Sequence, residues 1–276
     1  MEYTWQQASE QWKLDSAFKA SFKSDLSYLK YIDLEFKDLK LTDINRKVIE
    51  IFIQKRLKEG VKTSSINRHL SLIRAILNKA KKEWEWLTKV PYIKLLPEPQ
   101  GRIRWLTKPE ANRLLAELPE HTALIARFSL ATGLRKANVL GLQWSQIDLT
   151  RQVAWIHPDQ AKTRRAIPVP LNREALIILH LQQGKHKTHV FTYQNQPVQE
   201  VTTAAWYKAL KRAGIKDFKW HDLRHTWASW HVQAGTPLHI LQELGGWESV
   251  EMVRRYAHLD ATHLLQYANA SLITQN

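Results

Sequence analysis

The second half of the chain carries a set of basic, aromatic and hydroxyl-bearing side chains that lie beside glycines or at the ends of expected elements. These residues are Arg135, Lys162, His221, Arg224, Trp247 and Tyr256. His221 and Arg224 lie three residues apart at a helix start, so both project from the same side. Cationic, imidazole and phenol groups can bind an anion, move a proton or act as a nucleophile. This chemistry requires no thiol.

Other site chemistries find little support in the motifs. His221 and His225 have the four-residue spacing of a zinc pair, but no Glu follows His221 and no third ligand is evident. Gly245 and Gly246 form an isolated pair, which matches neither a P-loop nor a dinucleotide fingerprint. The chain has no Gly-x-Ser-x-Gly elbow and no cysteine, which excludes a catalytic thiol and a disulfide framework. We therefore expect no metal and no cofactor.

The charge balance indicates the class of partner. The 276 residues include 41 Lys and Arg against 26 Asp and Glu, a formal net charge of +15. This excess is present in both halves of the chain and favours a polyanion. No segment approaches the about 20 apolar residues of a membrane span, and the N-terminus does not resemble a secretory signal. We expect a soluble, cytoplasmic protein without a membrane partner.

The elements that must position these residues divide into two domains. Residues 1–87 have helical periodicity with few glycines or prolines, and the clearest helices are expected at 43–58 and 63–80. Residues 88–103 contain a cluster of prolines and predict a linker. Residues 104–276 form the second domain, in which a helix starts near Thr107 with Pro109 in its first turn.

Further along the second domain the period changes. Residues 153–156 and 166–169 favour strands and flank a basic segment, so we expect a hairpin with Lys162, Arg164 and Arg165 at its tip. Helices are expected at 107–118, 122–131, 172–183, 201–213, 221–234, 237–244 and 249–256. The predicted fold class is mainly α with a small β-sheet (α+β).

The order of these motifs resembles that of the tyrosine recombinases, the phage-integrase type of site-specific recombinase. ATGLRKANVLGLQW is similar to the segment of the first catalytic arginine, AKTRRAIPVP to the hairpin lysine and HDLRHTWAS to the His-x-x-Arg motif. LGGWESVEMVRRYAHL resembles the segment of the nucleophilic tyrosine, and SSINRHLSLIRAILNKAKKEWEWL resembles the helical core-binding domain. The resemblance covers nearly the whole chain, and five motifs in the right order make it specific.

The resemblance implies a reaction at DNA phosphodiesters. Tyr256 would attack the scissile phosphate to form a 3′-phosphotyrosyl bond, while Arg135 and Arg224 bind the nonbridging oxygens. His221 is the expected proton acceptor, and Lys162 the expected proton donor to the leaving 5′-oxygen. The covalent bond conserves the phosphoester energy, so rejoining needs neither ATP nor a metal.

Two positions depart from the family pattern. Trp247 lies nine residues before the tyrosine, where many relatives have a histidine. Its indole can donate one hydrogen bond but cannot shuttle a proton. Asn138 replaces an acidic residue that often follows the first arginine by three positions, which puts a carboxylate support there in doubt.

The resemblance also implies the partners. A core-binding domain (1–87) and a catalytic domain with a C-terminal tail (104–276) would enclose double-stranded DNA of the attachment-site type. Expected DNA contacts are Asn67, Arg68, Arg74, Arg164 and Arg165. A homotetramer on two DNA sites, a DNA-bending accessory protein and a nucleoid-associated location in a bacterial host are further expectations. The tail at 259–276 can pack within its own subunit or on a neighbour, and the extra arm-binding domain of many phage integrases is expected to be missing.

Alternative readings remain open at this point. A type IB topoisomerase uses the same tyrosine chemistry, and a noncatalytic DNA-binding protein from a decayed prophage would bind sites without forming adducts. Taken singly, each arginine is more often a solvated charge and each aromatic residue a core residue. Only the joint occurrence of the motifs favours the recombinase.

Overall fold

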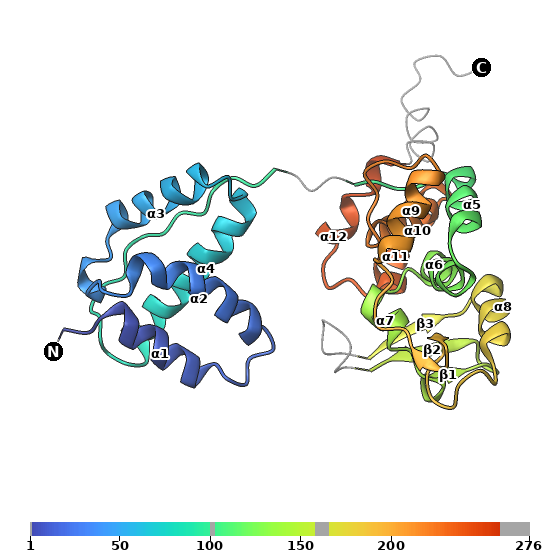
Figure 1. Cartoon of the computed structure of the whole chain (residues 1–276), viewed down its shortest axis with the longest axis horizontal. Coiled ribbons are helices and arrows are strands. Elements are labelled where there is room, and N and C mark those ends of the chain that lie inside the picture. Colours follow the sequence, from blue (N-terminus) through green and yellow to red (C-terminus); the bar gives the residue numbers. More distant parts are fainter. Residues whose placement is uncertain (1, 100–102, 158–165, 260–276) are drawn as a thin grey trace, which may run out of the picture. The chain divides into compact units, whose positions relative to one another are not determined.

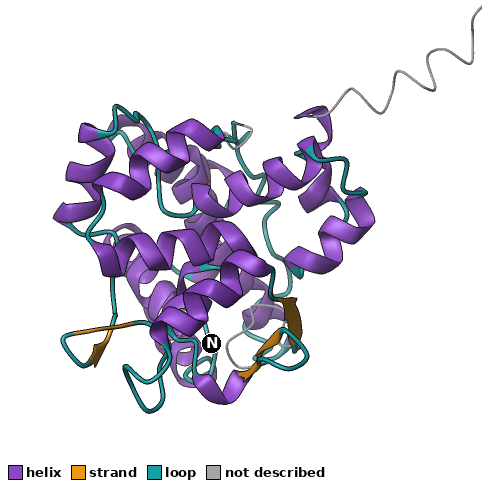
Figure 2. Cartoon of the chain, turned by 90° about the vertical axis from the view of Figure 1, so that its right-hand side faces the viewer, coloured by secondary structure: helices purple, strands orange, loops and turns teal. Residues whose placement is uncertain are grey.

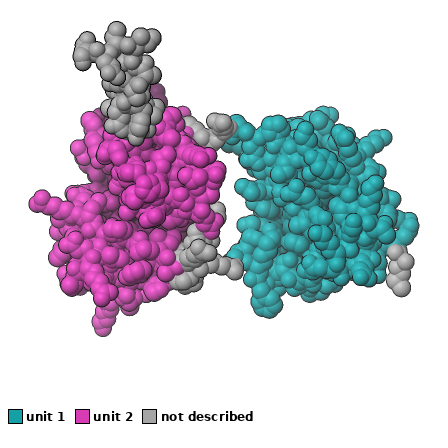
Figure 3. All heavy atoms as spheres, turned by 180° about the vertical axis from the view of Figure 1, so that it is seen from behind, with its two compact units in different colours: residues 1–101 teal, residues 102–276 magenta. Residues whose placement is uncertain are grey.

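The computed structural model (Figure 1) describes residues 2–99, 103–157 and 166–259. The chain divides into two compact units, Met1–Gly101 and Arg102–Asn276, which Figure 3 colours separately. Each unit has a hydrophobic core of its own.

The first unit is a bundle of four helices. They are α1 (Trp5–Asp15), α2 (Phe22–Phe36), α3 (Arg46–Lys58) and α4 (Thr63–Lys82). Helix α4 follows the predicted apolar stripe and buries Ile66, Leu70 and Ile73 completely. Helix α3 begins later than the predicted residue 43, because Asn45 caps it by accepting hydrogen bonds from the N–H groups of its first turn.

The proline-rich segment after the bundle packs more closely than a linker would. Ile93 is 3% exposed and belongs to the core of the first unit. Asn67 on α4 accepts a hydrogen bond from the Leu96 N–H and donates one to the Leu96 carbonyl. Most of the predicted linker at 88–103 is therefore fastened to the first unit.

The second unit is mainly helical with a small antiparallel sheet (Figure 2), which confirms the predicted fold class. Its helices are α5 (Lys108–Glu117), α6 (Glu120–Thr132), α7 (Lys136–Leu140), α8 (Arg173–Gln182), α9 (Ala204–Arg212), α10 (Asp222–Gln233), α11 (Leu238–Gly245) and α12 (Glu251–Arg254). The sheet has the order β1-β2-β3, with strands at Ile147–Asp148, Val153–Ile156 and Ile167–Pro170, and Ile156 opposes Ile167. A second ribbon pairs β4 (Thr192–Tyr193) with β5 (Gln196–Pro197).

Local sequence signals account for several of these elements. Thr107 caps α5 in a reciprocal capping box with Glu110, with Pro109 in the first turn as predicted. The two predicted strands pair as β2 and β3, whereas the tip between them (158–165) lies outside the described residues. The helix predicted at 249–256 is wrong in extent, because α12 ends at Arg254 and Tyr256 follows it.

Helices α6 and α10 organise the second unit, since α6 packs against both α10 and α8. One side of α10 joins a small apolar cluster made of Trp227, Ala228, Val232, Leu241, Val253 and Tyr256. Val253 and Tyr256 pack against α10 in this cluster. In the described part of the chain, no helix is long and apolar enough to cross a membrane.

Candidate active site

Arg224 connects the ends of two other helices. The residue is 6% exposed, and its Nη1 and Nη2 each donate a hydrogen bond of 2.5 Å, to the carbonyls of Gly133 and Gly245 respectively. Gly133 ends α6 and Gly245 ends α11, so both carbonyls lie at negative helix termini that favour a cation. A guanidinium has five N–H donors, which is enough to hold both carbonyls and still donate to a phosphate oxygen.

Trp247 covers the guanidinium of Arg224. The Arg224 Cζ lies 4.3 Å from the centre of the indole ring, a cation–π contact. The ring reaches this position because Gly245 has no side chain: a Cβ there would lie 2.1 Å from the ring carbon Cζ3 of Trp247. Gly246 follows as the C-cap of α11 with a φ of 57°, in the left-handed region that glycine tolerates.

Arg135 adds a second guanidinium near the first. It is half-buried and lies at the start of α7, directly after the turn that begins at Gly133. Burial, with the charge of Arg135 acting in the same direction, lowers the pKa of Arg224 to about 10, whereas Tyr256 acts in the opposite direction. Two cations forced together in a poorly hydrated site create a place for an anion.

His221 marks the start of α10. It retains exposed surface, and its ring centre lies 5.1 Å from that of His225, one helical turn later. Desolvation lowers the pKa of His221, and the guanidinium of Arg224 acts in the same direction, while the carboxylate of Asp222 opposes both. His221 is therefore neutral near pH 7 and able to accept a proton.

Tyr256 lies deep in the same cluster. The residue is 1% exposed, and its ring centre is 6.0 Å from that of Trp247. Its hydroxyl lies 2.5 Å from Nδ1 of His225. Burial raises the pKa of Tyr256, and the charges of Arg255 and Arg224 pull it down. The phenol is thus held protonated beside a hydrogen-bond acceptor.

The structure brings five of the six expected catalytic residues into one neighbourhood. These are Arg135, His221, Arg224, Trp247 and Tyr256. Lys162, Arg164 and Arg165 lie outside the described residues. His225 had no expected catalytic role, although its place next to Arg224 and one turn after His221 pointed to this site. Within the described ranges, no group of three or more His, Cys, Asp or Glu residues could hold a metal ion.

The expected DNA contacts on α4 separate into two kinds. Arg68 and Arg74 are exposed, as a phosphate contact requires, and their role stays a prediction. Asn67 is 4% exposed, and its amide is hydrogen-bonded to the backbone of Leu96 and the carboxylate of Glu98. The polar atoms of Asn67 therefore face the proline-rich segment in this structure, and its contact with DNA stays a prediction.

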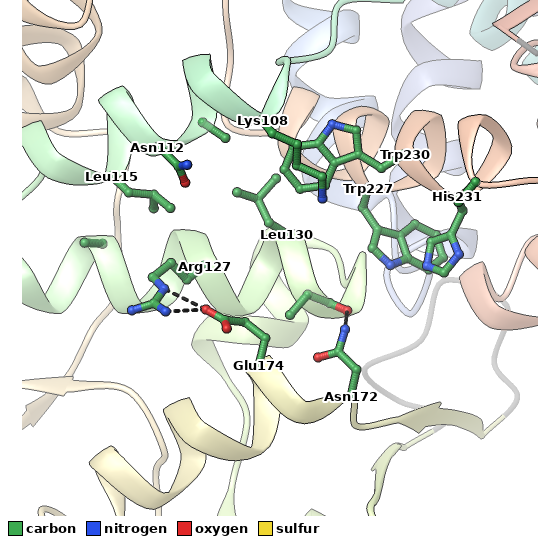
Figure 4. Close-up of a pocket in the computed structure, with 14 residues that line it drawn as sticks. Lys108, Asn112, Leu115, Arg127, Leu130, Asn172, Glu174, Trp227, Trp230 and His231 are labelled. Carbon is green, nitrogen blue, oxygen red and sulfur yellow. Dashed lines mark hydrogen bonds and ion pairs between the residues drawn. The ribbon is translucent and has the colours of Figure 1, made fainter.

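A cavity of about 780 Å³ (Figure 4) lies next to the candidate catalytic residues, with Trp227 at the boundary. Helices α5, α6, α8 and α10 line it, and Arg127 forms an ion pair with Glu174 at its side. Trp227 belongs to both regions, since it lines the cavity and packs so closely on Gly133 that a Cβ there would lie 2.3 Å from its ring. The cavity contains none of the expected catalytic residues.

Comparisons with known proteins agree with these motifs. Residues 104–263 match the model of the phage integrase family, and residues 20–83 match the phage integrase N-terminal SAM-like domain. The chain is 41% identical to the integrase of Salmonella phage P22, over 97% of this chain and 79% of that protein. It is 29% identical to a shufflon-specific DNA recombinase of Escherichia coli, over 85% of this chain and 59% of that protein.

Solved structures share the fold at low sequence identity. A lambda integrase dimer bound to a COC′ core site superposes with a TM-score of 0.75 at 20% identity, covering 93% of this chain and 77% of that one. The Tn1549 transposon integrase in complex with a circular intermediate DNA gives 0.79 at 15% identity, covering 97% and 99%. With the family model matching more than half of its length, the chain belongs to the phage integrase family of tyrosine recombinases.

Proposed function

We propose that this chain is a site-specific DNA recombinase that cuts and rejoins strands through Tyr256. One observation carries the proposal. The buried phenol of Tyr256, the buried guanidinium of Arg224 and the indole of Trp247 meet near the start of α10 and the end of α11. The names of its relatives, a phage integrase and a shufflon-specific DNA recombinase, support the same activity.

The two guanidiniums supply most of the chemical assistance in this proposal. Arg135 and Arg224 bind the nonbridging oxygens of the scissile phosphate, on which negative charge grows in the transition state. Because the site is preorganised by the carbonyls of Gly133 and Gly245, Arg224 needs little rearrangement when the phosphate arrives. The indole of Trp247 stabilises the guanidinium of Arg224 through a cation–π contact.

The covalent step follows from the position of the phenol. The Tyr256 Oη forms a bond to phosphorus as the bond to the 5′-oxygen breaks, which leaves a 3′-phosphotyrosyl linkage and a free 5′-hydroxyl. Lys162 is proposed to give a proton to the departing oxygen. Attack by a 5′-hydroxyl of a partner strand reverses the step, so the phosphoester energy is retained without ATP.

The partners are proposed on the same basis. Double-stranded DNA of the attachment-site type is the substrate, and Arg68, Arg74, Arg164 and Arg165 are the proposed DNA contacts outside the catalytic cluster. A related lambda integrase has been solved as a tetramer bound to a Holliday junction. We propose a homotetramer on two DNA sites for this chain, a DNA-bending accessory protein, and action in the cytoplasm of a bacterial host.

A covalent-trapping experiment tests the proposal. The substrate is a nicked duplex carrying the site that the protein selects from random-sequence DNA, so that the 5′-hydroxyl fragment diffuses away after cleavage. We expect an adduct that survives denaturation and disappears in Tyr256→Phe. Tyr207→Phe is the matched control, because Tyr207 is 61% exposed on α9. An adduct that persists in Tyr256→Phe would overturn the proposal.

A further inference from the structure

The hydroxyl of Tyr256 has a basic partner, His225, for which the sequence predicted no catalytic role. Its Oη lies 2.5 Å from Nδ1 of His225, and the two residues are 1% and 9% exposed. His225 follows Arg224 directly on α10, so the same helical turn positions both the phosphate-binding cation and this imidazole. A short hydrogen bond between buried groups fixes the direction in which the phenolic proton can leave.

His221, the proton acceptor expected from the sequence, lies in a different place. It is at the exposed start of α10, with its ring centre 5.1 Å from that of His225. Among the described residues, the hydroxyl of Tyr256 hydrogen-bonds to His225 and not to His221. A proton acceptor must be within about 2.6–3.2 Å of the proton donor, or reach it through one water. Geometry therefore favours the second histidine of the motif.

We propose that His225 is the proton acceptor for Tyr256, an inference that rests on the proposed function. As Oη forms its bond to phosphorus, the O–H bond breaks, its electron pair stays on oxygen and the proton moves to Nδ1. The bond between phosphorus and the 5′-oxygen breaks in the same step. When the strand is rejoined, the imidazolium returns the proton to the departing phenol.

The charges around His225 couple this transfer to DNA binding. Burial lowers the pKa of His225 to about 4, and His221, Arg255 and Arg224 all act in the same direction. Burial also raises the pKa of Tyr256, with Asp222 adding to it. In the free protein the proton therefore stays on the phenol. A bound phosphate adds negative charge beside Arg224, which offsets this cationic field and makes His225 more basic.

The first test replaces the imidazole with a group that keeps the hydrogen bond. His225→Asn retains an acceptor oxygen near the position of Nδ1 but cannot take up a proton. We expect adduct formation at pH 7.5 to be about 100-fold slower, within the range for loss of a general base. The rate should also rise about tenfold per pH unit between pH 7 and 9, as the phenolate fraction grows. If His225 only positions the phenol through this hydrogen bond, His225→Asn should cleave at a near-normal rate.

The second test uses a substrate whose leaving group needs no proton. In a 5′-bridging phosphorothiolate the departing atom is sulfur, which leaves readily as a thiolate. Such a substrate removes the need for the general acid and retains the need for the base. We expect His225→Asn to remain about 100-fold slower than the unmodified protein on it. Equal cleavage rates of His225→Asn and the unmodified protein on this substrate would overturn the inference, because His225 would then act on the leaving group.

Controls separate this inference from folding effects and from the proposed function. His231→Asn alters a half-buried histidine on the same helix that pairs with Thr236, and it should cleave normally. DNA affinity within twofold of the unmodified protein shows that a variant is folded, and His225→Gln serves if His225→Asn fails this check. If Tyr256→Phe abolishes the adduct while the folded His225 variant cleaves within threefold of normal, only the role of His225 is refuted. If Tyr256→Phe leaves the adduct intact, the proposed function fails as well.

Discussion

Gly245 is the position where one added methyl group should damage catalysis without damaging the fold. Its backbone lies at the end of α11 and outside the left-handed region, so alanine meets no conformational strain there. The added Cβ would lie 2.1 Å from Cζ3 of Trp247. Nonbonded carbons prefer about 3.5–4.0 Å, so the indole must move by roughly 1.4 Å or more.

The consequence of Gly245→Ala can be estimated from the contact that the indole leaves. Trp247 covers the Arg224 guanidinium at 4.3 Å, and a desolvated cation–π contact contributes about 2 kcal/mol. Loss of that amount from the transition state slows cleavage by about 30-fold. Overpacking costs about 1–3 kcal/mol, while the replacement of a helical glycine returns about 0.5–1 kcal/mol. We therefore expect a modest loss of stability and a large loss of cleavage.

A double-mutant cycle with Trp247→Ala checks this reasoning. Single-turnover cleavage of the nicked duplex gives the rate, and DNA affinity and thermal unfolding monitor binding and folding. In the Trp247→Ala background the new methyl group meets no indole, so Gly245→Ala should change the rate by less than about twofold. A further 30-fold loss in that background would refute the steric argument, as would normal cleavage by Gly245→Ala alone.

Three predictions concern the first unit. Asn67→Ala should lower the unfolding free energy of this unit by about 2 kcal/mol, because the hydrogen bonds to Leu96 and Glu98 are lost. Arg74→Ala should instead weaken DNA binding and reduce the salt-dependence slope of that binding by about 1. Equal salt slopes in Arg74→Ala and the unmodified protein would contradict this assignment. Burial lowers the pKa of His69 to about 4, so the neutral form is favoured on folding and stability falls as the pH drops below the ordinary value near 6.5. Denaturant titrations should show a loss of about 2 kcal/mol between pH 8 and pH 5, and this difference should vanish in His69→Phe.

The elements that sequence reasoning located best are those with strong local causes. Helix α4 has one continuous apolar stripe, and α5 begins with the reciprocal capping of Thr107 and Glu110. The segment at 249–256 lacks such signals. Its helix is short because Val253 and Tyr256 are positioned by packing against α10 and α11. The hydrogen bonds of Asn67 could not be predicted for a related reason, since the partner of its amide lies 29 residues further along the chain.

The sequence by itself determined the family, the fold class and the identity of most candidate catalytic groups, because residue types and their order carry this information. It also placed His221, Arg224 and His225 on one helical turn. Only the tertiary structure decided which histidine meets the phenol. That contact depends on how the segment around Tyr256, 31 residues after His225, packs against α10 through Trp227, Leu241 and Val253. Helical spacing brings both histidines to the site, and long-range packing selects between them.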